Sequence, residues 1–566
     1  MSKAKNILIL SISFIMLSAT GFAQSNSPTD STVLIINSGF KPFLTDAFKI
    51  KDNPSIKDTG KIIPKLNYSF LDKQIPVGFQ IDLIKAAKIK GEPLVKLYRG
   101  YAKVGFGTNT TPLAELYYNA KRSKNLSFGF FGKHLSSNGI AKNDYSGYSN
   151  NHLSFFGKHF SKEFTTIGKV GYTRDVNHYY GISEKAFLNP SNDLTLVNKA
   201  STKQKIDKID IGFSLARNFT DSSQLDYNAA IDFHNLKDKF GVTENHLELA
   251  GNLSKYHKQE LYSLGVEVNY NKLINPLSLD RNLVLGINPT ISTSTEKWQF
   301  KVGIGLYLNS YPDTKFHFYP KAEFKYNVVE DIIIPYVGIR GGLISNNLNT
   351  FYKENPFINT VDLAVQNTNQ KYDIYGGIRG SLSSKLTFNT SFSQQKLEGL
   401  PLYVKDFGSL LENKFLVSYD TVNISTITTE LTYQKLEKLK VLLGAKYFKY
   451  TPKNEIKAWH KPDLKISLSG IYDLSDKIIV RADFYYFSQQ YAKSLSTITS
   501  NNITTTTEIA SKLKGVFDAN IGLEYRYTKK LSAYINFNNI GSVRYERFQD
   551  YPTQKFGVLG GLTYSF

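Results

Sequence analysis

Apolar and polar residues alternate along most of this chain. From about residue 95 onward, segments of 8–13 residues carry an apolar side chain at every second position, and a turn follows each segment. One segment has apolar side chains at Phe517, Ala519, Ile521, Leu523 and Tyr525, and polar side chains or glycine at Asp518, Asn520, Gly522, Glu524 and Arg526. A period of two predicts β-strands with one apolar and one polar face.

We count about 22 such segments between residues 95 and 566, which makes the chain all-β. Their expected spans are 95–107, 112–119, 126–134, 151–159, 164–173, 209–218, 224–234, 244–254, 259–271, 281–291, 297–309, 315–327, 333–342, 372–381, 385–394, 424–434, 439–448, 463–473, 477–487, 514–526, 530–540 and 555–566.

The connections between these segments alternate in length. Those after even-numbered segments are tight, at 121–125, 161–163, 220–223, 255–258, 292–296, 328–331, 381–384, 435–438, 474–476 and 528–529. Those after odd-numbered segments are often long, at 135–150, 174–208, 343–371, 395–423, 449–462, 488–513 and 541–554. A membrane barrel has short periplasmic turns and longer outer loops, whereas a soluble sandwich has no reason to keep its long loops at one end.

The pattern therefore predicts an antiparallel up-and-down transmembrane β-barrel over residues 95–566. An even number of strands places both termini in the periplasm. The apolar face meets lipid and the polar face lines the lumen, so Asp518, Asn520, Glu524 and Arg526 are candidate lumen-facing residues. The long loops would bind, gate or cap the pore.

The first residues have the features of a secretory signal peptide at 1–23. Lys3 and Lys5 form a positive start, an apolar stretch follows, and small residues lead to a cleavage site between Ala23 and Gln24. This predicts export through the Sec pathway and an outer-membrane location.

The amino-acid composition excludes some kinds of chemistry and one class of membrane protein. The chain has no cysteine, which removes disulfides, thiolate nucleophiles and Cys-ligated metals. Its formal net charge is +21. This charge favours attraction to anionic lipid head groups, lipopolysaccharide or an anionic solute, or it reflects lysines scattered over turns and loops. The mean hydropathy of -0.28 excludes a polytopic helical membrane protein but not a barrel.

The last segment has a signature of its own. Val558, Gly560, Leu562, Tyr564 and Phe566 alternate up to a terminal aromatic residue. This resembles the C-terminal signal by which outer-membrane barrels engage the barrel-assembly machinery, which is therefore an expected partner during biogenesis.

An even strand number near 22, long outer loops and the terminal sequence GGLTYSF resemble the barrel of TonB-dependent receptors over residues 95–566. The Lys/Asn/Tyr-rich strands are also similar to outer-membrane proteins of Bacteroidota. TonB-dependent receptors carry a folded plug before the barrel, whereas residues 24–94 are too short for a complete plug. This periplasmic or luminal segment is either a partial plug, a handle for a partner, or an irregular leader along the inner wall.

Catalytic motifs are missing from the sequence. There is no G-x-S-x-G, H-E-x-x-H or G-x-x-x-x-G-K-[ST] pattern, and the nine histidines are scattered. We therefore expect no enzyme, no cofactor and no metal site. The basic residues are distributed rather than concentrated, which argues against nucleic-acid binding.

Two functional hypotheses remain. In the first, the barrel helps to transport a solute across the outer membrane. In the second, it is a structural or assembly subunit that binds other outer-membrane proteins or lipoproteins through its outer loops and its N-terminal segment. The missing plug adds weight to the second hypothesis, because an open pore of this width would leak, but transport stays slightly favoured.

Overall fold

The computed structural model describes residues 98–566, except for 121–122, 141–144, 183–196, 219–223, 277, 330–331, 437 and 501–502. The expected signal peptide, its cleavage site at Ala23 and Gln24, and the segment 24–94 lie outside the described residues and stay predictions. No described helix is long and apolar enough to cross a membrane.

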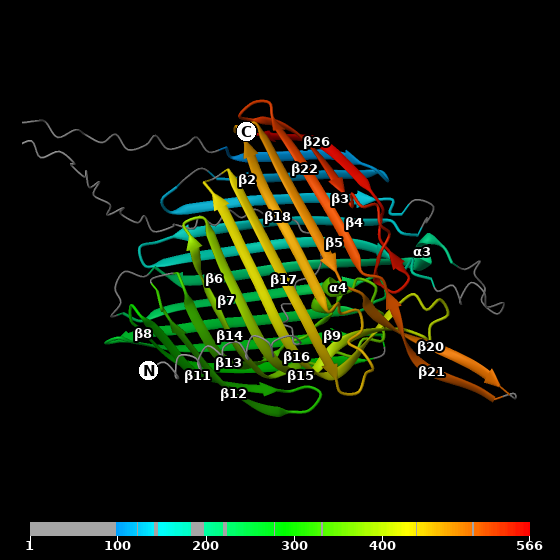
Figure 1. Ribbon diagram of the computed structural model, residues 1–566, viewed down its shortest axis with the longest axis horizontal. Helices are drawn as coiled ribbons and strands as arrows, with labels where there is room; N and C mark the ends of the chain where they lie inside the picture. Colours follow the sequence, from blue (N-terminus) through cyan, green and yellow to red (C-terminus); the bar gives the residue numbers. More distant parts are fainter. Residues whose placement is uncertain are drawn as a thin grey trace, which may run out of the picture. The chain divides into compact units, whose positions relative to one another are not determined.

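The described residues form β-strands and two short helices (Figure 1). Their bounds are β1 Gly100–Gly107, β2 Thr111–Asn119, β3 Leu126–Ser137, β4 Tyr148–Phe160, β5 Phe164–His178, α3 Lys199–Thr202, β6 Lys203–Arg217, β7 Asp226–Asp238, β8 Thr243–His257, β9 Glu260–Ile274, β10 Leu279–Ser294, β11 Trp298–Asn309, β12 Lys315–Tyr326, β13 Ile334–Ile344, α4 Leu348–Glu354, β14 Thr368–Ser383, β15 Leu386–Lys405, β16 Phe415–Lys435, β17 Leu439–Pro452, β18 Leu464–Leu474, β19 Ile478–Phe487, β20 Gln490–Ser500, β21 Ile503–Leu513, β22 Val516–Arg526, β23 Leu531–Asn538, β24 Glu546–Phe548, β25 Tyr551–Pro552 and β26 Gly557–Ser565.

Twenty-two of these strands form one closed antiparallel sheet, as the sequence predicts. Each strand pairs with the next one along the chain, apart from β20, β21, β24 and β25, which form two separate two-stranded sheets. The last strand, β26, pairs with β1 from Tyr101 opposite Ser565 to Gly107 opposite Leu559. This pairing leaves the sheet without a free edge, so the backbone can satisfy its hydrogen bonds within a membrane.

The alternation in the sequence corresponds to the two faces of the wall. Outward side chains are apolar and exposed, as for Val104 and Phe106 on β1 and Phe517 on β22. Exposed apolar side chains recur on nearly every strand of the closed sheet. In water such a surface would be unfavourable, so its natural environment is lipid.

Three connections that we expected to be loops contain strands. The stretch 488–513 is the hairpin β20–β21, which extends beyond the barrel (Figure 1). The stretch 395–423 is largely continuous strand, because β15 and β16 run on to 20 and 21 residues. The stretch 541–554 contains β24 and β25. In β15 the alternation is lost because Leu400, Leu402 and their neighbours are buried on both faces by other loops.

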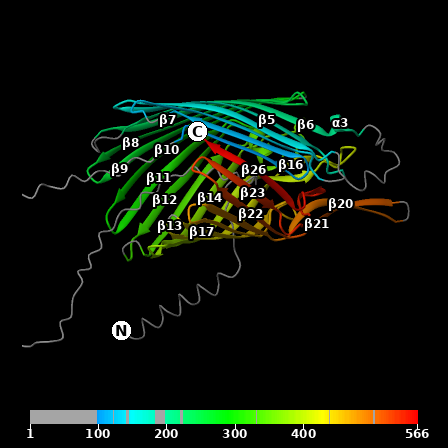
Figure 2. The same ribbon diagram turned by 90° about the horizontal axis from the view of Figure 1, so that it is seen from above.

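The tight turns and the long connections lie at opposite ends of the barrel. The hairpin β20–β21 and helix α3 share one end, which we call the long-loop end (Figure 2). The other end is the tight-turn end.

Candidate functional site: a loop cap at the long-loop end

The loop 345–367 between β13 and β14 carries the short helix α4. Asn347 begins this helix with a capping box, in which its side chain accepts from the Thr350 amide (2.8 Å) and its own amide donates to the Thr350 hydroxyl (2.9 Å). The box satisfies amides that an α-helix leaves unpaired at its first turn. The local sequence thus fixes where α4 begins, and packing decides where it lies.

Glu244 at the start of β8 holds the first turn of α4 against the inner wall. Its carboxylate accepts from the amides of Leu348 (2.5 Å) and Asn349 (3.1 Å), and it contacts His234 Nε2 (3.0 Å) and the Asn271 amide group (3.3 Å). The Glu244 side chain is fully buried. Hydrogen bonds to a buried carboxylate are among the stronger ones in proteins, so this contact is a principal anchor of the loop.

Two further anchors join the same loop to neighbouring strands. The Thr360 hydroxyl donates to Asp238 at the end of β7, which also accepts from the Gln204 side chain (3.2 Å). At the far end of the loop, Asn367 exchanges amide hydrogen bonds with Asn282 on β10 (2.8 and 2.9 Å). Together with Glu244, these contacts attach the loop along β6 to β10.

The loop is also attached to β15, β16 and the connection that follows β17. Ile358 forms a parallel bridge with Phe415, and the Asn359 amide donates to the Phe415 carbonyl (2.7 Å). Glu354 forms an ion pair with Lys461 and accepts from the Tyr403 hydroxyl (3.0 Å). Burial alone would raise the pKa of Glu354, but Lys461 and the Tyr403 hydroxyl together lower it below its ordinary value.

Three loops from distant parts of the wall meet in one aromatic contact. Phe357 stacks on Tyr551 with ring centroids 3.7 Å apart, and the ring of Tyr180 lies 4.8 Å from Tyr551 and 5.7 Å from Phe357. Tyr180 follows the fifth strand of the closed sheet, Phe357 the thirteenth and Tyr551 the twenty-first. Loops that start so far apart around the wall can meet only by crossing the mouth of the barrel.

We call the packed segments 179–182, 345–367 and 541–556 the loop cap. A single apolar cluster joins them to the strand ends, and its buried members are Ile206, Leu236, Val242, Leu273, Leu348, Phe351, Tyr352, Ile358, Leu363, Val365, Tyr403, Phe415, Phe548 and Tyr551. Burial of this size stabilises the cap in the way a small domain core does.

His460, in the connection between β17 and β18, is buried beneath the cap. Its Nδ1–H donates to the Tyr403 carbonyl (3.1 Å), and its Nε2 accepts from the Gln549 amide (3.4 Å). A ring that accepts at Nε2 is the neutral imidazole, since both nitrogens of the protonated ring are donors. Burial lowers the pKa of His460 to about 3, so the ring stays neutral at physiological pH.

The candidate lumen-facing residues lie on β22 between the exposed apolar positions of that strand. Glu524 forms an ion pair with Arg481 (3.1 Å) on β19, and Arg526 pairs with Asp473 (3.3 Å) on β18. Asn520 accepts from the Asn539 amide (2.9 Å). Of the four candidates, Asp518 alone contacts the cap, through Tyr545.

Strand β22 contacts the last long connection through Asp518, which lies next to Tyr545. Asp518 is buried, and its carboxylate accepts from the Tyr545 hydroxyl (3.4 Å).

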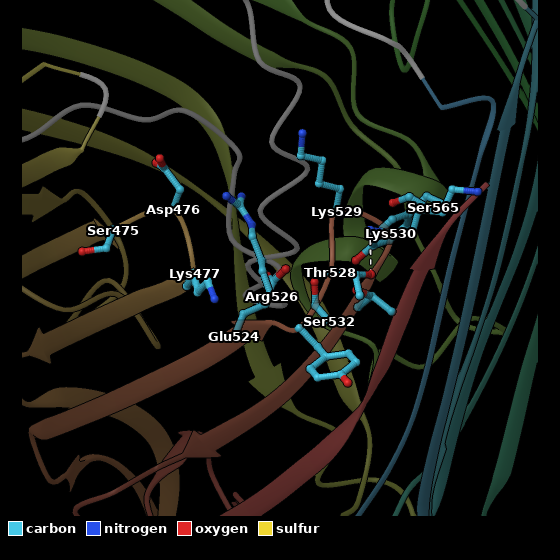
Figure 3. Close-up of a pocket in the computed structure, with 13 residues that line it drawn as sticks. Ser475, Asp476, Lys477, Glu524, Arg526, Thr528, Lys529, Lys530, Ser532 and Ser565 are labelled. Atoms are coloured by element: carbon cyan, nitrogen blue, oxygen red, sulfur yellow. Dashed lines mark hydrogen bonds between the residues drawn. The ribbon is translucent and has the colours of Figure 1, made fainter.

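Glu524 and Arg526 instead border a cavity of about 700 Å³ at the tight-turn end (Figure 3). The turns 475–477 and 527–530 form much of its wall, and Lys529 and Asp476 stand on different sides of it. The cavity is open and mixed in charge, so it does not define a specific ligand. Among the described residues, no group of three or more His, Asp or Glu side chains could hold a metal ion.

Nothing in the local sequence marks Glu244, His460 or the aromatic contact as functional. Glu244 occupies one polar position of an alternating segment and is indistinguishable there from Glu248. Only the fold shows that one is buried against a helix and the other is exposed.

The closed wall, the apolar outer face and the loop arrangement define an outer-membrane β-barrel like those of TonB-dependent receptors. No protein-family model matches the sequence, and no curated protein matches it. Solved structures do match the fold. The ferric-catecholate import receptor Fiu of E. coli is 12% identical, with a TM-score of 0.60 over 83% of this chain and 82% of its own.

Two further solved barrels match the fold of this chain to a similar extent. The ferric enterobactin receptor PfeA of Pseudomonas aeruginosa is 13% identical, with a TM-score of 0.59 over 82% of this chain and 81% of its own. The FrpB iron transporter of Neisseria meningitidis is 10% identical, with a TM-score of 0.62 over 84% of this chain and 82% of its own. At these identities the likeness concerns the fold, and the three are named as receptors or a transporter rather than as enzymes.

Proposed function

We propose that this protein is a gated uptake barrel of the outer membrane, in which the loop cap closes the outer mouth at rest and opens to admit a solute. The observation that carries this proposal is the contact of Tyr180, Phe357 and Tyr551 across the mouth. An open pore does not require contacts between loops across its mouth, whereas a closed gate does.

Two properties of the cap support a gate rather than a permanent wall. The contacts that hold 345–367 are hydrogen bonds, ion pairs and ring packing, which can break and reform. Several of the anchoring groups are charged and buried, and such groups are strongly sensitive to solvation and protonation. With the long loops placed outside the cell, a solute in the medium meets the cap first.

The gate can be tested with a cysteine in the lumen, because the chain has no cysteine of its own. Glu248→Cys on β8 places a thiol four residues from Glu244 on the same strand face. A bulky membrane-impermeant maleimide added to intact cells should label this thiol slowly. Replacing 348–366 by a short Gly/Ser linker should raise the rate at least tenfold.

The control for this replacement is deletion of 497–506 from the hairpin β20–β21, which keeps the contact of Ser494 with Gln549 of the cap and should not change the rate. Equally fast labelling of all three proteins would overturn the gate. Growth on limiting solutes with the gene deleted then identifies what is transported.

The hairpin β20–β21 favours a second candidate function, an assembly subunit. Residues 505–509 are exposed on both faces, and the buried residues among the described part of the hairpin, Gln490, Ala492 and Leu513, lie at its base. A subunit role predicts that other outer-membrane proteins co-purify in equal amounts and are lost when 497–506 is deleted. A receptor role predicts purification alone.

The C-terminal strand supports the proposed partnership with the barrel-assembly machinery. Tyr564 and Phe566 project outward and are exposed at the closing seam between β26 and β1. An exposed aromatic end on the strand that closes the barrel suits recognition before closure.

A further inference from the structure

One seam of the barrel wall is mostly unpaired. β12 and β13 pair over four positions, from Ala322 opposite Ile339 to Lys325 opposite Tyr336. The next shortest pairing in the closed sheet, between β22 and β23, has six. β12 and β13 have 12 and 11 residues, so most of the length of each strand lacks its neighbour on this side.

Pro320 and a register shift in β13 between Arg340 and Gly342 lie at the point where the pairing stops. The Asn327 amide bonds to Lys297 next to β11, and the Val328 amide bonds to Ile333 next to β13. Since the hydrogen-bonding direction alternates along a strand, the even-numbered residues of β12 turn their backbone groups toward β13. Pro320 has no N–H to give there.

The unpaired groups lie at the level of the apolar outer face. The paired positions of β12 end at Ala322, so the pairing does not reach Phe318 or Phe316. Phe316 is 66% exposed and Phe318 is 58% exposed, the former being the most exposed phenylalanine of the described residues. In hydrocarbon the free N–H groups of these two residues are costly without an acceptor.

On the inner side a tyrosine takes the place of the missing pairing. Tyr319 is 2% exposed, and its hydroxyl reaches past β13 to donate to Asn369 on β14 (2.6 Å). Gly341 of β13 makes room for the ring, because a Cβ there would lie 2.6 Å from Tyr319 Cδ1. The ring of Tyr319 therefore lies against β13 on the inner side of the seam.

We propose that the β12–β13 seam is a binding site for an amphipathic membrane lipid. Its acyl chain lies along Phe316 and Phe318, and its ester or head-group oxygens accept from the free N–H groups of the same residues. A partner β-strand fits less well, because Pro320 would interrupt its hydrogen-bond ladder in the middle. The site depends on the outer-membrane location and not on gated uptake.

Photolabelling tests this site in the full-length protein. The purified chain is reconstituted in phosphatidylcholine vesicles that contain a phosphatidylcholine with a diazirine on one acyl chain, and the labelled positions are found by mass spectrometry. Tyr319 should be labelled at least threefold more than Asn271, which is also 2% exposed but belongs to the continuously paired β8–β9 seam. Only a lipid that enters the seam reaches Tyr319.

One variant restores the missing group of the seam. Pro320→Thr supplies the missing N–H donor on β12. This variant should lower labelling of Tyr319 to the level of Asn271. Equal labelling of Tyr319 and Asn271 in the unaltered protein, or a co-purified polypeptide cross-linked to β12, would overturn the proposal.

Discussion

The carboxylate of Glu244 accepts a hydrogen bond from the amide of Leu348, although 104 positions separate the two residues in the chain. Glu244 stands at the end of a wall strand, and Leu348 begins the helix that lies across the mouth. The contact therefore joins the rigid part of the barrel to the segment that would have to move if the mouth opened.

Replacing Glu244 should loosen the loop cap without unfolding the wall. Glu244→Ala leaves the amides of Leu348 and Asn349 without their acceptor, at a cost of about 2–4 kcal/mol in the stability of the closed cap. The measurement is hydrogen exchange of 345–367 in detergent, which should accelerate at least tenfold. Glu248→Ala, on the same strand face but exposed, is the matched control and should leave the exchange unchanged.

Acid should open the cap through His460. The pKa of this ring is lower in the closed cap, at about 3, than its ordinary value of 6.5. The opened state therefore binds more protons between these values, so the stability that His460 contributes is complete above pH 6.5 and is lost as pH falls toward 3. The opening equilibrium of 345–367, obtained by dividing the exchange rate by the intrinsic amide rate at each pH, should rise between pH 7 and 5, and His460→Gln should flatten that rise. An identical pH profile in the variant would show that another group is responsible.

Tyr551 should contribute to closure more than most aromatic residues of the barrel. It is buried, and it stacks on Phe357. Tyr551→Ala removes this packing and should destabilise the closed cap by about 3 kcal/mol, seen as faster maleimide labelling of a luminal cysteine. Tyr527→Ala, at a position that is 68% exposed, should have no such effect.

Phe566 should affect closure of the barrel through its backbone contacts and assembly through its ring. Two variants separate these effects. The Phe566 amide donates to the Gly100 carbonyl (2.9 Å), and the Phe566 carbonyl accepts from the amides of Arg99 and Gly100. Phe566→Ala keeps these backbone contacts and removes only the ring, whereas deletion of Phe566 removes both. If the ring is the assembly signal, both variants should reduce the heat-modifiable barrel in outer membranes equally; if closure limits assembly, only the deletion should.

The sequence by itself determined the wall of this barrel. All 22 expected strands are present, because a strand between lipid and lumen must alternate and the alternation is visible in any one segment. Where a strand no longer lies between lipid and lumen, its sequence no longer predicts a strand. The outer part of β15 is buried on both faces, so its sequence lost the period of two and we expected a loop.

Only the tertiary structure decided how the mouth is closed. Glu244, Phe357 and Tyr551 lie far apart in the chain, and nothing in their local sequence records that they meet. The same holds for the open seam, since Pro320 interrupts a strand that otherwise alternates normally. Local patterns record the environment of each residue, whereas contacts between distant loops depend on the closed ring of strands that brings them together.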